Sequence, residues 1–218
     1  MVRALLAVAL CLLAGVHAQS RAASVVPVEG CAALPNYNNA TNIAGPWTIR
    51  VDGCTNATAT QESCSIEGFG ASCDVTRSAD EKGIEKGSLT IVNHPLDTNI
   101  VLRCNGALNT LEARVPSGAG ALDWHAIGLD KDPGTSQMEW GFGAKNTHLV
   151  RVYRQYLRGR PVDGLFLGSE GRTTWAVRSS GSGLSSLDHK PFWFLRLLNP
   201  EMPAWGDELE TMIRINGI

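Results

Sequence analysis

The segment Trp47-Thr48-Ile49-Arg50-Val51 alternates apolar and polar side chains, and this period of two recurs along most of the 218-residue chain. Successive side chains of a β-strand point to opposite faces of a sheet, so the alternation predicts a strand with one buried face. Similar patterns predict further strands over residues 88–92, 100–103, 111–115, 123–129, 138–142, 149–153, 162–167, 173–177 and 192–198. The sequence therefore predicts an all-β protein.

Turn-forming residues separate the predicted strands. Clusters of Gly, Pro, Ser and Asp occur at residues 116–120, 130–134 and 179–183. Short strands at this spacing are typical of an antiparallel meander. The sequence has no internal repeat and no linker, which favours a single domain after the N-terminal segment.

The hydrophobic period changes only near the C-terminus. Four apolar residues are spaced at i, i+4, i+7 and i+8: Trp205, Leu209, Met212 and Ile213. This spacing predicts one apolar face of an α-helix over residues 201–215. Asn199 followed by Pro200 is a start signal for such a helix. We expect this helix to pack outside the sheet.

The first residues predict export from the cell. Arg3 precedes an apolar run over residues 4–16, which is too short to span a bilayer and ends before a small residue, Ala18. We expect residues 1–18 to be a signal peptide and residues 19–218 to be one secreted domain. No later apolar run reaches the roughly 18 residues of a membrane helix, so no integral membrane span is predicted.

The charge balance argues against a nucleic-acid partner. The chain has 19 basic and 21 acidic residues and a formal net charge of −2. A protein that binds a phosphate backbone normally carries an excess of Lys and Arg.

Five cysteines remain once Cys11 is removed with the signal peptide: Cys31, Cys54, Cys64, Cys73 and Cys104. In an oxidising compartment they are disulfide candidates. Five choices of the odd cysteine and three pairings of the others leave 15 arrangements open. The odd cysteine is either a free thiol or the link of a disulfide-bonded dimer.

Asparagine sequons are the other feature that depends on export. They begin at Asn39 and Asn56, and both are expected glycosylation sites unless they are unused turns. The four histidines of the mature chain are scattered singly: His94, His125, His148 and His189. Without a local ligand framework, neither a metal site nor a cofactor is predicted.

Residues near both ends of the domain resemble the lipocalin family of the calycin superfamily. At the N-terminal end these are Cys31, Pro35, Asn42, Gly45 and Trp47. Towards the C-terminus they are Trp175, Ala176, Val177 and the segment 192–196, which ends in Arg196. The following segment is similar to that of apolipoprotein D and of bacterial and plant lipocalins. The family's second motif is represented only by residues 168–172, and strands two to four cannot be placed in register.

The resemblance implies an eight-stranded antiparallel up-and-down β-barrel with a C-terminal α-helix packed outside. It also implies a structural signature of Gly45, Trp47 and Arg196. In the family the arginine stacks across the tryptophan at the closed end of the barrel. Such a cation–π contact contributes about 0.5–2 kcal/mol. We therefore expect Trp47 and Arg196 to touch.

An eight-stranded barrel encloses space for side chains or for one small ligand. The resemblance implies a carrier of a small hydrophobic molecule, such as a lipid, fatty acid, sterol, retinoid or pigment. Twelve apolar strand positions are candidates for the wall: Ile49, Val51, Leu89, Ile91, Leu111, Ala113, Trp124, Trp140, Phe142, Val152, Phe166 and Trp175. Each is also a candidate for plain core or for the outer face, because a one-residue register error reverses its direction.

Four arginines lie close together around Tyr153 and Tyr156: Arg151, Arg154, Arg158 and Arg160. At a barrel mouth they would hold a carboxylate or phosphate head group. The alternative is a solvated strand edge and hairpin.

Two further functions remain open beside the carrier. A rigid barrel whose loops bind or inhibit a protein is favoured by a filled interior, whereas a cavity of a few hundred Å³ favours the carrier. The sequence has neither a Gly-x-Ser-x-Gly elbow nor a phosphate-binding loop, so we do not expect an enzyme. A lipocalin-type isomerase or de-epoxidase that uses the free cysteine as nucleophile is the second alternative.

Overall fold

A computed structural model describes residues 24–55, 73–74, 87–92, 101–117, 121–130, 137–140, 148–179 and 192–217. These residues form antiparallel β-structure with one short 3-10 turn, η1 (Cys31–Ala33), and no α-helix. The strands are β1 (Ser24–Pro27), β2 (Tyr37–Asn38), β3 (Ile43–Thr55), β4 (Cys73–Asp74), β5 (Gly87–Val92), β6 (Leu102–Asn105), β7 (Thr110–Ser117), β8 (Ala121–Leu129), β9 (Met138–Trp140), β10 (His148–Leu149), β11 (Arg151–Leu157), β12 (Arg160–Pro161), β13 (Phe166–Gly168), β14 (Thr174–Ser179), β15 (Phe192–Leu197) and β16 (Leu209–Gly217).

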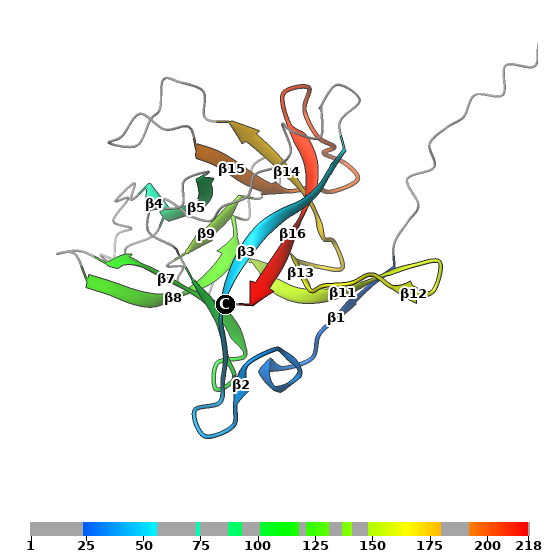
Figure 1. Cartoon of the computed structure of the whole chain (residues 1–218). Helices are drawn as coiled ribbons and strands as arrows, with labels where there is room; N and C mark the ends of the chain where they lie inside the picture. Colours follow the sequence, from blue (N-terminus) through cyan, green and yellow to red (C-terminus); the bar gives the residue numbers. More distant parts are fainter. Residues whose placement is uncertain are drawn as a thin grey trace, which may run out of the picture.

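The strands form one strongly curled antiparallel sheet (Figure 1). β6, β7, β8 and β9 pair in chain order, as do β14 and β15. Several pairings depart from a simple meander. β5 pairs with β9 and β15, and β16 pairs with β13, β14 and β3. The expectation of an all-β antiparallel fold is confirmed.

The pairing of β16 with β3 brings together segments from opposite ends of the chain. Ile213 lies opposite Val51, and Ile215 lies opposite Ile49. All four side chains belong to one core cluster of buried apolar residues. This cluster also includes Trp175 from β14, and the face of the sheet that carries it is called the inner face.

The predicted α-helix over residues 201–215 is wrong. Its second half is the strand β16, in which Ile213 is buried in the core cluster while Met212 beside it points to the opposite face. The predicted helix start does form one turn, because the Oδ1 of Asn199 accepts the backbone N–H groups of residues 201 and 202. Arg196 then donates to the backbone carbonyls of Met202 and Pro203, which a continuing helix would need.

The N-terminal segment closes one end of the inner face. β1 pairs with β11, and η1 follows it with Leu34 buried in the core cluster. A disulfide joins Cys31 of η1 to Cys104 of β6, at a Cα–Cα distance of 5.5 Å. This covalent link fixes the segment against the sheet. In the described part of the chain, no helix has the length and apolar character needed to cross a bilayer.

Candidate ligand-binding site

The inner face of the curled sheet carries most of the predicted wall residues whose side chains are described. Seven of them belong to the core cluster: Ile49, Val51, Leu89, Leu111, Ala113, Val152 and Trp175. Their direction follows from strand register. Ala113, for example, is fully buried, whereas Arg114 beside it is exposed. The inner face is therefore a continuous apolar surface.

Two predicted wall residues lie on the other face. Phe166 is buried, but its neighbours Leu165 and Leu167 belong to the core cluster and Phe166 does not. It pairs with Tyr153 on the outer side of the sheet. Trp124 is half-buried, and its ring lies 4.1 Å from the guanidinium carbon of Arg103. Other residues of each strand enter the core instead, so the register places the side chains of Phe166 and Trp124 on the outer face.

The side chains of three further wall candidates lie outside the described part of the structure. Ile91 lies in β5 and Trp140 in β9, but their side chains are outside the described part of the structure. Phe142 lies outside the described residues altogether.

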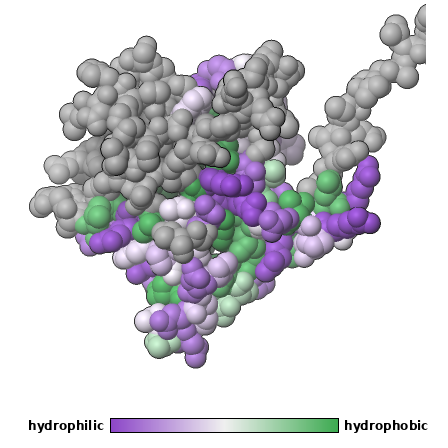
Figure 2. Space-filling view, viewed as in Figure 1, coloured by the Kyte–Doolittle hydropathy of each residue, from purple (hydrophilic) through white to green (hydrophobic). Residues whose placement is uncertain are grey.

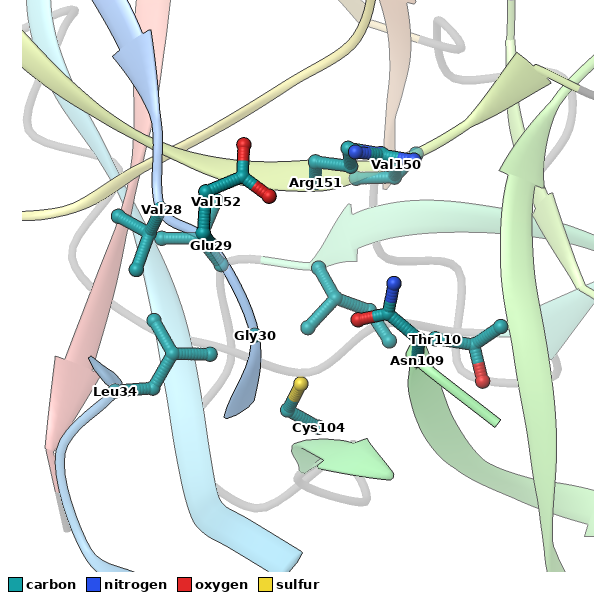
Figure 3. A pocket seen from close by; sticks show the side chains of 11 residues that line it. Val28, Glu29, Gly30, Leu34, Cys104, Asn109, Thr110, Val150, Arg151 and Val152 are labelled. Atoms are coloured by element: carbon teal, nitrogen blue, oxygen red, sulfur yellow. The ribbon is translucent and has the colours of Figure 1, made fainter. Parts of the chain in front are cut away.

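A small pocket lies at the disulfide end of the inner face (Figure 3). Its volume is about 40 Å³. It is lined by Val28, Glu29, Gly30, Leu34, Cys104, Asn109, Thr110, Leu111, Val150, Arg151 and Val152. A water molecule needs roughly 10–15 Å³ measured in this way, so the pocket has room for a few waters and not for a lipid. The Oγ1 of Thr110 is buried there without a hydrogen-bond partner among the described residues.

The four clustered arginines are exposed on β11 and its hairpin. The β11–β12 turn consists of Arg158 and Gly159, whose φ angles of 53° and 73° are those of a type I′ turn. The hairpin tip is hydrophilic on the surface (Figure 2). Of the four arginines only Arg151 lines the small pocket. Arg154, Arg158 and Arg160 match the solvated hairpin that the sequence left as an alternative.

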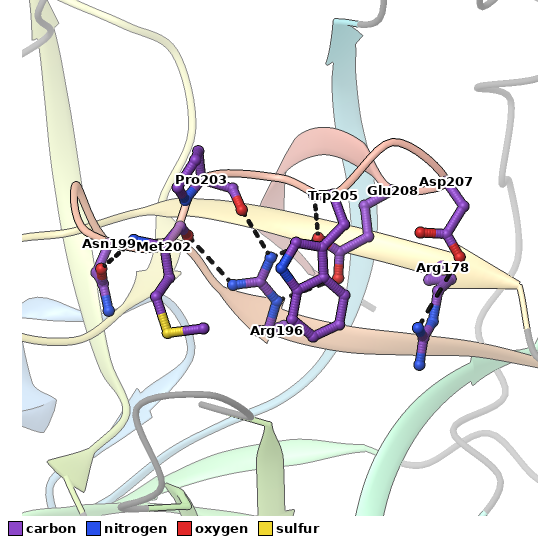
Figure 4. Close-up of polar contacts among 8 residues, drawn as sticks. All are labelled: Arg178, Arg196, Asn199, Met202, Pro203, Trp205, Asp207 and Glu208. Carbon is purple, nitrogen blue, oxygen red and sulfur yellow. Dashed lines mark hydrogen bonds and ion pairs between the residues drawn. The ribbon is translucent and has the colours of Figure 1, made fainter.

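Arg196 does not contact Trp47. Its guanidinium carbon lies 4.4 Å from the centroid of the Trp205 ring, on the outer face of the sheet (Figure 4). The reason is alternation along β15, where Leu195 and Leu197 belong to the core cluster and Arg196 between them points away. The predicted stacking therefore occurs with a different tryptophan.

Arg196 is also the centre of a buried polar network. It forms a two-pronged ion pair with Glu208, and the side chains of both residues are almost fully buried. The same guanidinium donates to the carbonyl oxygens of Met202 at 3.2 Å and Pro203 at 3.1 Å. Glu208 in turn accepts the backbone N–H of Trp205 at 2.9 Å. These bonds fasten the 199–208 loop to the outer face.

Trp47, the other half of the expected signature, is buried in the core cluster with 1% of its surface exposed. Its indole Nε1 has no hydrogen-bond partner among the described residues. A buried donor left in this state costs about 1–3 kcal/mol. The inner face thus contains a polar atom that would gain from an acceptor. Gly45, the remaining signature residue, has a φ of 116°.

The Cys31–Cys104 disulfide reduces the 15 open pairings to three, one for each choice of the odd cysteine among Cys54, Cys64 and Cys73. Cys54 and Cys73 lie in strands whose side chains are not described there, and Cys64 lies outside the described residues. Sequence reasoning could not select the pair, because 73 residues separate its members.

Only one of the two sequons lies in the described part of the chain. Asn39 is exposed in a turn, as an acceptor of glycan must be, and Asn56 lies outside the described residues. Within the described ranges, no three His, Cys, Asp or Glu side chains gather as a metal ion would require.

The chain matches no protein-family model and no curated protein. The strand pairing places the protein in the all-β class, with one strongly curled antiparallel sheet.

Proposed function

We propose that the protein is a secreted, lipocalin-like carrier that binds one small hydrophobic molecule on the inner face of its curled sheet. The observation that carries this proposal is the pairing of β16 with both β14 and β3. Through β6 to β9, β5 and β15, the ladder of pairs returns to its starting strand. We infer a closed barrel from this path, although the position of β5 differs from the family's up-and-down order.

The chemistry of the inner face supports an apolar ligand. The inner face collects apolar side chains from strands of both halves of the chain. Burial of apolar surface contributes about 25 cal/mol per Å², so such a wall favours a lipid-like molecule. The indole N–H of Trp47 would donate to a carbonyl, hydroxyl or carboxylate group of that ligand.

One observation favours the second candidate, a rigid scaffold whose loops bind a protein. The pocket beside the disulfide measures about 40 Å³, well below the roughly 300–1,000 Å³ of pockets that hold drug-sized ligands. A carrier must therefore place its ligand elsewhere on the inner face. The isomerase alternative depends on a free thiol among Cys54, Cys64 and Cys73, which thiol titration would detect.

Native mass spectrometry of the secreted, deglycosylated protein tests the carrier, followed by solvent extraction of any bound molecule. We expect one lipid, sterol, retinoid or pigment per chain, or binding from a panel of fatty acids and retinoids. A matched pair of variants locates the site. Ala113→Leu fills the inner face and should weaken binding, whereas Arg114→Leu alters the outer face and should not. A protein that is empty and binds nothing from the panel would favour the loop-mediated protein binder.

A further inference from the structure

A second pocket lies on the outer face of the sheet. It has a volume of about 230 Å³ and is lined by residues of β14, β15 and the 199–208 loop, together with Gln137. Arg178 pairs with Phe194 across β14 and β15, so their side chains share one face. That face is opposite to the one on which Val177 and Leu195 enter the core cluster. Leu195 of the core cluster also lines the pocket, whereas the side chains of Arg178 and Phe194 reach it from the outer face.

An exposed aromatic ring forms one side of this pocket. Trp205 remains 43% exposed, although it is one of the largest apolar side chains of the protein. The guanidinium carbons of Arg196 and Arg178 lie 4.4 and 5.5 Å from its ring centroid (Figure 4). The ring is held by the loop that Arg196 and Glu208 fasten, so its position is fixed in advance. A flat apolar group can pack against it without reordering the loop.

The charges around the pocket favour an anion. Among the described residues, two arginines and one carboxylate, that of Glu208, line it. Arg196 is neutralised by Glu208, whereas the ion pair of Arg178 with Asp207 has a longer separation of 3.9 Å. The side chains of Arg178 and Asp207 are 41% and 67% exposed. Exposed ion pairs of this kind are weak, so an anionic ligand can compete for Arg178.

A buried donor points to the same ligand chemistry. Gln137 lines the pocket, and its amide Nε2 is buried without a hydrogen-bond partner among the described residues. Its backbone is fixed, because it bridges to Arg196 and its carbonyl accepts the N–H of Asp130 at 3.0 Å. An acceptor on a ligand would satisfy this amide. A carboxylate can accept from Gln137 and from Arg178 together, and bonds to a charged group are the stronger kind.

We propose that this outer pocket binds a small aromatic carboxylate. Its aromatic ring packs against Trp205 and Phe194, and its carboxylate accepts hydrogen bonds from Arg178 and Gln137. A volume of about 230 Å³ is below the range of pockets that hold drug-sized ligands, so a single indole or phenyl group with a short acidic arm is the appropriate size.

Titration of the full-length protein with indole-3-acetate tests this site. The readout is the Trp205 indole N–H signal in a ¹⁵N NMR spectrum, assigned with the Trp205→Phe variant. We expect a saturable shift of that signal, and about tenfold weaker binding of the neutral indole-3-acetamide. Arg178→Gln and Gln137→Leu should each weaken indole-3-acetate binding about tenfold. Arg154→Gln, which removes an exposed arginine from β11, should leave binding unchanged.

Four results would overturn the proposal. The first is no shift of the Trp205 signal at ~10 mM indole-3-acetate, a concentration far above that needed for millimolar affinity. The second is equal binding of the amide and the acid. The third is equal loss of affinity in Arg154→Gln and Arg178→Gln. Shifts confined to other tryptophan signals would also overturn the outer site, while they would support a ligand on the inner face.

Discussion

Removal of the Glu208 carboxylate is expected to destabilise the protein far more than removal of the neighbouring Asp207 carboxylate. Both are acids of the same loop, and both face an arginine. The side chains of Glu208 and Arg196 are 4% and 6% exposed. Those of Asp207 and Arg178 are 67% and 41% exposed, and their closest charged atoms are 3.9 Å apart. The two acids therefore test burial at nearly constant sequence position.

The size of the loss in unfolding free energy follows from the charge of Arg196, which remains buried after the substitution. In Glu208→Gln the guanidinium of Arg196 stays buried, because its bonds to the carbonyls of Met202 and Pro203 are retained. Breaking a buried ion pair by removing one partner costs about 3–5 kcal/mol. The exposed pair of Asp207 contributes only about 0–1 kcal/mol, so Asp207→Asn should be nearly neutral.

Equilibrium urea unfolding measures both changes. With a slope of about 2 kcal/mol per molar urea, the Glu208→Gln midpoint should fall by about 1.5–2.5 M. Adding Arg196→Met should recover much of this loss, because an apolar pair removes the uncompensated charge. The reasoning is refuted if Glu208→Gln costs less than about 1 kcal/mol, or if it costs no more than Asp207→Asn. Failure of the double variant to recover would assign the effect to packing instead of charge.

Three further changes test the fold, each measured as the free energy of unfolding in urea. Ile213→Ala should cost about 2–5 kcal/mol and Met212→Ala much less, because only Ile213 is in the core cluster; equal losses would contradict the strand register. Replacing Cys31 and Cys104 together by Ala should cost about 4 kcal/mol, since their disulfide closes a loop of 73 residues; a neutral effect would exclude that bond. Gly168→Ala should cost about 1–3 kcal/mol, because a Cβ there would lie 2.0 Å from a backbone carbonyl oxygen. An unchanged urea midpoint would contradict this close approach of the two backbone segments.

Local alternation was enough to locate several strands. The segment 47–51 lies within β3, and the prediction over 123–129 lies within β8. Segment 47–51 carries polar residues at every second position, which defines both the strand and its buried face, whereas 123–129 defines only the strand. The class of fold could therefore be read from the sequence.

The direction of individual side chains was less accessible. Leu165, Phe166 and Leu167 are all apolar, so nothing in the sequence shows which of them faces the core. The structure places the two leucines inward and Phe166 outward. Trp124 was misplaced for a similar reason, since its partner Arg103 comes from another strand.

The helix predicted over residues 201–215 was wrong because its apolar residues fit both the helical and the strand period. The spacing of Trp205, Leu209 and Ile213 matches a helix, but Leu209, Thr211 and Ile213 also alternate as a strand would. Pairing with β3 and β14 decided between them, and such pairing is not visible locally. The same limit applies to Arg196, whose aromatic partner lies on a loop that reaches it only in the folded protein.

The contact between β3 and β16 also has a consequence for the timing of folding. β3 is among the first strands to be synthesised and β16 is the last of those described, so their pairing has a very long contact order. Until β16 is available, one side of β3 and one side of β14 have unpaired backbone groups, and such edges pair readily with other chains. Closure of long-range pairs is also slow. A nascent chain of this protein therefore exposes unpaired, aggregation-prone edge strands until β16 is synthesised. Pairing of β16 with β3 and β14 then completes the sheet.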